Sequence, residues 1–266
     1  MTHALDRDPI YRRRRFDPAT IELCVRWYLT YRLSYRDLVQ MMAERGVTVS
    51  YSTILRWVQR YVPEFEKRWS RYAQSVDPSR RMDETAVRVR EGGSHYLYRA
   101  VDRHGKTVDS LLCTDRGDSS ARAFFTKALV THRLRPPQKV NLDGNAATHR
   151  ALRDLKQKNP LWRKVEVRVN GYLNNVVEQD HRAIKRRCAA MLGLKSYRTA
   201  AITLAGIELV HRVRKRQFAL RARDAHRFAS LKELWTCALR PYQAGIEASG
   251  VTFSSVTPKR TRTHVL

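Results

Sequence analysis

The sequence has little of what would indicate a secreted protein or a membrane protein. Its four cysteines lie far apart and form no Cys-x-x-Cys pair, so neither a zinc site nor a disulfide framework is expected. The N-terminus lacks the apolar segment of a secretory signal. The longest apolar run, residues 200–210, is too short to span a bilayer and contains Glu208. We therefore expect a protein of the reducing cytoplasm.

Motifs of several enzyme classes are also missing. The chain has no phosphate-binding G-x-x-x-x-G-K loop and no G-x-S-x-G nucleophile turn. The nine histidines show no metal-ligand spacing, and packing is the favoured role for His181. The sequence therefore gives no sign of a phosphate-binding loop for nucleotides or of a serine nucleophile.

Acidic residues are scarce relative to basic residues, and this imbalance indicates the kind of partner that the protein binds. The 266 residues include 52 Lys and Arg but only 25 Asp and Glu, which gives a formal net charge of +27. Neutralisation of phosphates by such cations drives binding to nucleic acid. The cations are spread along the chain and are mostly arginine, which suits phosphate better than lysine does. We therefore expect a protein that binds nucleic acid.

Residues 16–62 have the pattern of three short helices, with the last two in a helix-turn-helix arrangement. Asp17 and Pro18 suit the start of the first helix, and Ser34 with Asp37 forms a capping box for the second. The third helix is expected to begin at Ser50 or Ser52 and to stop at Pro63. A plain helical bundle with a polar exterior is the alternative. In the DNA-binding reading, the side chains that reach the major groove are those of Ser52, Thr53, Arg56, Gln59 and Arg60.

From residue 81 the hydrophobic period changes to that of strands, and the elements predict a mixed α/β sheet flanked by helices. We expect strands at 82–89, 95–102, 107–113, 139–142 and 165–169, and helices at 119–132, 147–158, from 175, from 194 to about 223, and at 228–239. The expected organisation is a basic arm (1–15), a helix-turn-helix domain (16–62), a connector (63–80), a catalytic domain (81–223) and a basic extension (224–266).

Three acids stand at the ends of these elements in an otherwise basic chain. Asp83 lies early in the first strand, Asp143 follows the fourth, and Glu178 lies on the helix after the fifth. If the first and fourth strands are neighbours, Asp83 and Asp143 meet at one edge of the sheet. Three carboxylates suit two magnesium ions, which is the arrangement for in-line displacement at phosphorus.

Each acid also has a simpler explanation. Glu84 competes with Asp83, since alternation along a strand turns only one of the two towards the site. Asp143 with Gly144 is a common turn dipeptide. Glu178, three residues after Asn175, fits a helix N-cap with its reciprocal acid, followed by a solvated basic helix.

Five segments resemble the DDE transposases of the insertion sequence six family. Asp143 and Glu178 are separated by 34 residues, which is the spacing of that family, and Lys185 follows seven residues after Glu178 as a basic residue does there. The resemblance covers roughly residues 16–220. The segments are SYRDLVQMMAERGVTVSYSTILRWVQRY at 34–61, RMDET at 81–85, YLYRAVDRHG at 96–105, NNVVEQDHRAIKRR at 174–187 and MLGLKSYRTAAITLAGIEL at 191–209.

The resemblance implies an RNase H-like catalytic domain in which Asp83, Asp143 and Glu178 hold Mg²⁺, with Mn²⁺ as a substitute. It implies that a DNA 3′-OH attacks a target phosphodiester, with cointegrates as products. It further implies a homo-oligomer, at least a dimer, that bridges the terminal inverted repeats of an element and the target DNA. Beside the acids, the DNA backbone is expected to contact Arg182, Lys185 and Arg186.

The sequence departs from the family pattern after the second acid. The family commonly has Thr-Asp-Lys-x-x-x-Tyr, whereas this chain has Leu142-Asp143-Gly144 and then Thr148 in place of the tyrosine. Two alternatives therefore stay open. One is a catalytically weak or inactive transposase-derived regulator that only binds DNA, and the other is a related nuclease that hydrolyses DNA without joining it.

Overall fold

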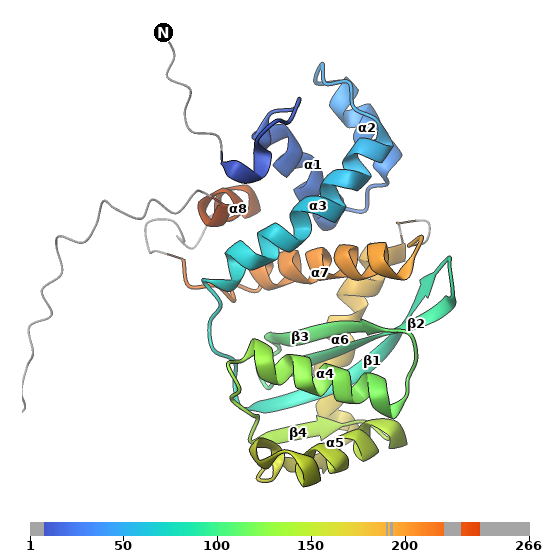
Figure 1. The fold of residues 1–266 in the computed structure, drawn as a ribbon, viewed down its shortest axis with the longest axis vertical. Coiled ribbons are helices and arrows are strands. Elements are labelled where there is room, and N and C mark those ends of the chain that lie inside the picture. The colour runs from blue at the N-terminus through green and yellow to red at the C-terminus, as the bar shows by residue number, and fades with distance from the viewer. Residues whose placement is uncertain (1–7, 190, 192–193, 221–229, 240–266) are drawn as a thin grey trace, which may run out of the picture.

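The computed structural model describes residues 8–189, 191, 194–220 and 230–239. Half of the expected basic arm and most of the expected extension after residue 224 lie outside these residues. Figure 1 shows two layers, with a group of helices above a sheet that carries helices on both faces. Among the described residues, no helix has both the length and the apolar character that a membrane crossing requires.

The upper layer is built from the N-terminal helices, and their starts agree with the sequence. Side chains of Asp17, Ser34 and Ser50 each accept a backbone hydrogen bond at a helix N-terminus, and Ser34 forms the predicted capping box with Asp37. Gly46, with φ of +70°, lies in the turn before the third helix. The elements are η1 (Pro9–Tyr11), α1 (Pro18–Thr30), α2 (Tyr35–Ala43) and α3 (Tyr51–Ser70).

Helix α3 does not stop at Pro63, so this prediction was wrong. The helix runs on to Ser70, with the exposed Pro63 in its interior. Proline removes one backbone hydrogen bond of a helix. However, Tyr61, Val62, Phe65 and Trp69 are all buried on the inner side of the helix, so the apolar stripe continues across the proline. The burial of these side chains outweighs the local penalty.

The lower layer is a five-stranded sheet in the order β3-β2-β1-β4-β5. The first three strands form the predicted antiparallel meander, whereas β4 pairs in parallel with β1 and with β5. This order and these directions are those of an RNase H-like sheet. The strands are β1 (Ser79–Val89), β2 (Gly93–Asp102), β3 (Thr107–Cys113), β4 (Lys139–Leu142) and β5 (Glu166–Val169).

Alternation along the strands sends side chains to two different helical layers. Met82 and Tyr98 belong to a core shared with α4 (Asp118–Thr131) and α5 (Ala146–Lys158). The opposite face of the sheet is covered by α6 (Gly171–Ala189) and α7 (Tyr197–Arg214), as Figure 1 shows. The remaining elements are η2 (Pro160–Trp162) and α8 (Leu231–Leu239).

Two helix boundaries differ from the sequence prediction. Helix α6 begins at Gly171, where the Asn170 side chain accepts a hydrogen bond from the Tyr172 N–H, so Asn175 does not cap it. Helix α7 ends at Arg214 and does not continue to residue 223. After it, Arg216 adopts φ of +57°, and Phe218 forms a bridge with Ala73, which draws the chain towards the end of α3.

The N-terminal helices share one hydrophobic core with α7 and α8. Helices α3 and α7 pack along each other, and α1 crosses nearby. Gly206 of α7 lies at this crossing, where a Cβ atom would come within 2.7 and 2.9 Å of the two Leu29 methyl carbons and 3.1 Å of Val62. The glycine therefore permits the close approach of the three helices.

We predict that Gly206→Val destabilises the protein by about 1–3 kcal/mol, because the added side chain overpacks a closed interface. In a helix with free space, replacing glycine would change stability little or improve it. Denaturant unfolding of the full chain measures the effect. The matched control is Ala205→Val on the neighbouring, half-buried position. Equal stability of the two variants would contradict the close packing of α1 and α3 on α7.

Candidate active site

The pairing of β1 with β4 brings Asp83 and Asp143 together. The parallel register aligns Arg81 with Asn141, and two residues further on the same alignment places Asp83 beside Asp143, just after β4 ends. The condition under which the two acids were expected to meet, that the first and fourth strands are neighbours, is therefore fulfilled. Carboxylate oxygens of Asp83, Glu84 and Asp143 lie within 4.8 Å of one another.

Glu84 contributes to this cluster together with Asp83, so the expectation that only one of the two could face the site was wrong. Alternation does put them on opposite faces of the sheet, but the adjoining β4 ends here and leaves an open edge that both reach. Oε1 of the buried Glu84 accepts hydrogen bonds from Asn145 Nδ2 at 2.7 Å and from Arg116 Nε at 2.6 Å. Arg116 also lies 3.7 Å from Asp143.

Arg116 and Asn145 were not identified from the sequence. Arg116 lies in the loop before α4, and Asn145 caps α5 while its backbone N–H donates to Asp143 Oδ1 at 3.1 Å. Asn145, at an unspecified position of the family pattern, thus supplies both a helix cap and a contact to Glu84. An asparagine directly before a helical pattern signals such a cap. No local signal connects Arg116, 27 residues earlier, with the same carboxylates.

Glu178 lies on the second turn of α6 and is exposed. Because the helix starts at Gly171, the capping explanation for Glu178 is wrong. Its carboxylate lies outside the 4.8 Å group, but its charge is close enough to contribute to the raised pKa of Asp83. The helix therefore holds Glu178 near the other two acids with its side chain towards solvent.

Burial, with a smaller contribution from the negative charges of Glu84, Asp143 and Glu178, raises the pKa of Asp83 to about 6, although a hydrogen bond from the Glu84 N–H acts to lower it. His181, one turn after Glu178, places Nδ1 3.4 Å from Asp83 Oδ2. Burial and the nearby charges of Arg99 and Lys185 lower the pKa of His181 to about 3. The imidazole is therefore neutral, and the contact is a polar one without charge pairing.

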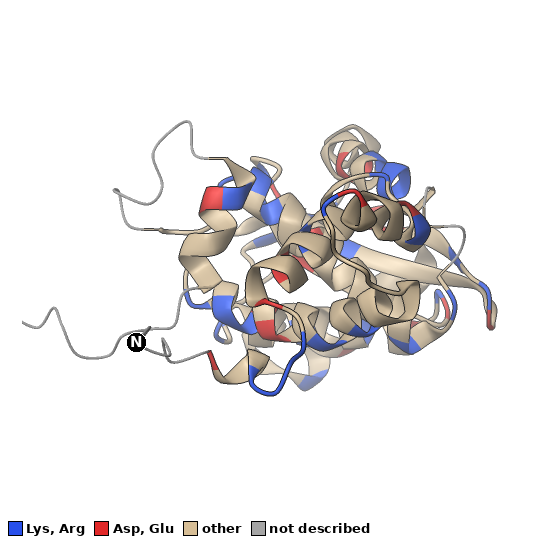
Figure 2. Cartoon of the chain, turned by 90° about the horizontal axis from the view of Figure 1, so that it is seen from above, with Lys and Arg blue, Asp and Glu red and all other residues tan. Residues whose placement is uncertain are grey.

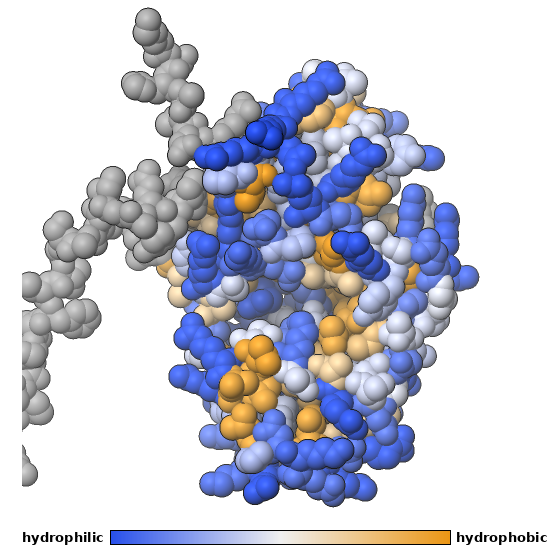
Figure 3. Space-filling view, viewed as in Figure 1, coloured by the Kyte–Doolittle hydropathy of each residue, from blue (hydrophilic) through white to orange (hydrophobic). Residues whose placement is uncertain are grey.

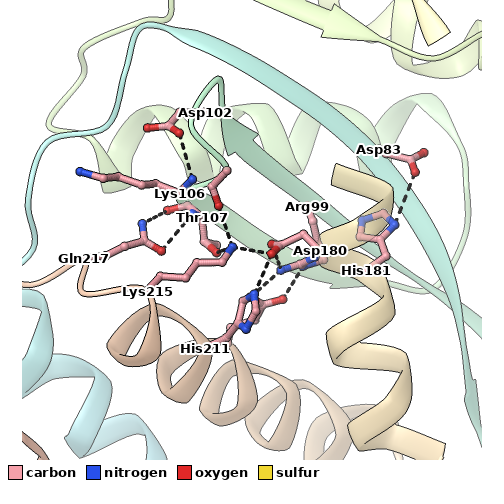
Figure 4. A network of polar contacts seen from close by, with 12 residues as sticks. Asp83, Arg99, Asp102, Lys106, Thr107, Asp180, His181, His211, Lys215 and Gln217 are labelled. Atoms are coloured by element: carbon pink, nitrogen blue, oxygen red, sulfur yellow. Dashed lines mark hydrogen bonds and ion pairs between the residues drawn. The ribbon is translucent and has the colours of Figure 1, made fainter. Parts of the chain in front are cut away.

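A buried ion cluster holds α6 in this position (Figure 4). Arg99 of β2 is fully buried and donates to Glu208 of α7 at 2.5 Å and to Asp180 of α6 at 2.7 Å. Asp180 also accepts from His211 at 2.7 Å and from Lys215. Burial alone would raise the pKa of Asp180, but these three cationic or donor groups keep it well below its usual value.

The residues proposed to contact DNA are distributed over both layers. On α3, Arg56 and Arg60 are exposed, and Ser52 and Thr53 lie at its start beside Ser50. Gln59 was expected on the outer face, but it faces α7 and its Nε2 donates to the Thr199 carbonyl at 3.4 Å. On α6, exposed positions are occupied by Arg182, Lys185 and Arg186, which share that helix with Glu178.

Basic side chains cover the molecule beyond these positions. Figure 2 shows Lys and Arg on most elements, with fewer acidic residues among them. Figure 3 shows a largely hydrophilic face with separate apolar patches. An acidic cluster in a surface of this sign is suited to hold a divalent cation next to a polyanion. The oxygen donors of Asp83, Glu84, Asp143 and Glu178 are the hard ligands that Mg²⁺ prefers, so the residues fit such an ion.

Comparison with known proteins identifies a DDE domain and similar transposases. Residues 78–217 match a family model described as a DDE domain. The chain is 36% identical over 206 residues to the transposase for the insertion sequence-like element IS431mec of Staphylococcus aureus, which covers 77% of this chain and 89% of that protein. The transposase for insertion sequence element IS257 in transposon Tn4003, also from S. aureus, gives the same identity and coverage.

Among solved structures, the catalytic core domain of BIV integrase is similar with a TM-score of 0.37 and 19% identity, over 50% of this chain and 83% of that one. The family assignment rests on the sequence matches. They span the sheet that carries Asp83 and Asp143, the α6 helix that carries Glu178 and, for the curated relatives, more than three quarters of the chain. The chain belongs to the insertion sequence six family of DDE transposases.

Proposed function

We propose that this chain catalyses DNA strand transfer, in which the 3′-OH of an element end attacks a phosphodiester of target DNA. The observation that carries the proposal is the meeting of Asp83 and Asp143 at the edge of the sheet, with Glu178 held beside them by α6. These three acids are the residues that the family resemblance implies as metal ligands. Joining of both element ends to a target would produce a cointegrate.

Asp83, Asp143 and Glu178 would hold Mg²⁺, with Glu84 as a further oxygen donor within reach. When bound, Mg²⁺ activates the attacking hydroxyl and offsets charge on the phosphodiester. The chain's own residues chiefly position the reactants. Neutral His181 supports Asp83 from the α6 side, and Arg116 restrains Glu84 from the α4 side. Positioning of this kind is the main protein contribution in phosphoryl transfer.

We also propose that DNA contacts both layers. Arg182, Lys185 and Arg186 would hold the backbone beside the acids, whereas Ser52, Thr53, Arg56 and Arg60 at the open side of α3 would contact the terminal inverted repeat. Gln59 stays a weaker candidate because of its contact with Thr199. Synapsis of two ends requires a homo-oligomer, at least a dimer.

Asp143→Asn is expected to abolish strand transfer, with a loss of at least 10³-fold, because one carboxylate ligand is removed without change of size. The assay mixes the full chain, labelled element-end DNA, a target plasmid and Mg²⁺, and measures joined product. Binding of element-end DNA, measured by fluorescence anisotropy, should be retained. The matched control is Asp154→Asn, an acid on α5 that pairs with Arg122 away from the cluster.

Three results of this assay separate the candidate functions. Joining by the native chain that is lost in Asp143→Asn supports strand transfer. Binding without joining or cleavage would assign the chain to a DNA-binding regulator. Cleavage without joining would assign it to a nuclease that uses water in place of the 3′-OH.

Mg²⁺ affinity is expected to fall as the pH drops through 6. A proton on Asp83 competes with the ion, and the raised pKa of about 6 puts this competition well above the usual carboxylate range. Between pH 8 and pH 5 we expect about a tenfold loss of affinity from this one group. Calorimetric Mg²⁺ titrations at several pH values measure it. Asp83→Asn should bind Mg²⁺ weakly and without this pH dependence; a native affinity unchanged down to pH 5 would refute the assignment.

A further inference from the structure

A polar pocket lies away from the acidic cluster, where α1, α6 and α7 meet. It has a volume of about 250 Å³. Its wall is formed by apolar side chains such as Leu29 and Ile184, together with polar and basic groups. The polar and basic lining residues are Thr30, Arg32, Arg186, Arg187, His211 and Arg214.

Arg187 lines this pocket, and its guanidinium lacks hydrogen-bond partners. It is only 5% exposed, yet Nε and both terminal nitrogens make no hydrogen bond. Its guanidinium carbon lies 5.0 Å from the centre of the Tyr28 ring, which stabilises the charge but accepts none of its five N–H groups. The buried Thr30 Oγ1, another lining group, also lacks a partner.

No carboxylate of the described residues forms an ion pair with Arg187 or with the other lining arginines. Burial lowers the pKa of Arg187, and the groups that raise it again are Tyr28, Cys188 and Tyr35. The pocket histidine, His211, already donates to Asp180. A buried cation without a counter-charge strongly disfavours folding. The pocket is therefore lined by several donors whose positive charge is not offset by an ion pair with any carboxylate of the described residues.

We propose that this pocket binds a phosphate group, held by the Arg187 guanidinium and the Thr30 hydroxyl and surrounded by Arg32, Arg186 and Arg214. Arginine donates through a planar fork that fits phosphate oxygens. The group is either a DNA backbone phosphate or a free inorganic anion. This pocket would bind an anion, whereas the acidic cluster would bind a cation.

The pocket lies between the two layers of the molecule. Arg187 follows Glu178 by nine residues on the same helix, which is a rise of about 14 Å and two and a half turns, so the two side chains leave opposite sides of α6. On its other side, the pocket is bordered by the end of α1, in the layer of α3. A phosphate bound here would therefore contact α6 and the N-terminal helices on the side of α6 opposite Glu178.

The first experiment compares thermal unfolding of the full chain in sodium phosphate and in sodium chloride of equal ionic strength. A ligand that binds only the folded state raises the unfolding midpoint in a saturable way. We expect this rise for the native chain and its loss in Arg187→Met, with phosphate affinity reduced at least tenfold. In chloride alone, Arg187→Met should be as stable as the native chain or more stable, because an uncompensated buried charge is replaced by an apolar side chain.

Two further variants complete this experiment. Thr30→Val keeps the shape of the pocket and should weaken phosphate binding without unfolding the chain. Arg153→Gln on α5, on the opposite face of the sheet, removes one positive charge away from the pocket and should leave phosphate binding unchanged. Together they keep the test valid if Arg187→Met itself proves difficult to fold.

The second experiment identifies the source of the phosphate. The logarithm of the affinity for a DNA duplex is measured against the logarithm of salt concentration, and loss of one phosphate contact reduces the slope by about 0.9. A reduction in Arg187→Met but not in Arg153→Gln assigns the pocket to the DNA backbone. An unchanged slope with lost phosphate stabilisation assigns it to a free anion. Absence of saturable phosphate stabilisation in the native chain, whatever the slope, would overturn the proposal.

Discussion

The full burial of Arg99 is the constraint on which the arrangement of this protein depends. A guanidinium without access to water needs its counter-charges inside the protein, and the loss of one such partner typically costs about 3–5 kcal/mol. Glu208 and Asp180 provide them from two different helices. Because Arg99 belongs to β2, both α6 and α7 are held against the same face of the sheet. Through α6 this fixes the position of Glu178, and through α7 it fixes the N-terminal helices.

The acidic cluster shows how a metal site can be assembled at the end of a strand. Asp83 and Glu84 are sequence neighbours that leave β1 on opposite faces, and they approach the same point only because β4 has ended. One carboxylate is supported from the α6 layer and the other from the α4 layer. The pKa of Asp83 is raised first by burial and then by the neighbouring carboxylates, so the charged form of this residue is disfavoured in the chain alone. Stability is reduced locally where ligands for a cation are gathered.

Much of this fold was predictable from the sequence, because it follows from local periodicity and capping. The strands, their order in the meander and the caps at Asp17, Ser34 and Ser50 depend on nearby residues. The errors arose where distant packing prevails, as at Pro63, where burial of Phe65 and Trp69 carries the helix onward. Asp83 and Asp143 were found as acids at strand ends. The contacts of His181, Arg116 and Arg99 join segments far apart in sequence, so no local pattern predicts them.

The continuity of α3 has a geometric consequence. Its 20 residues form one rod about 30 Å long, which packs along α7 and is not interrupted by a hinge at Pro63. Helix α7 is in turn tied to the sheet through Arg99. The exposed start of α3 and the acidic cluster are thus two ends of a single rigid frame. Under the proposed function, a base contacted by the first turn of α3 would lie at a fixed distance from the phosphodiester that reacts beside Asp83.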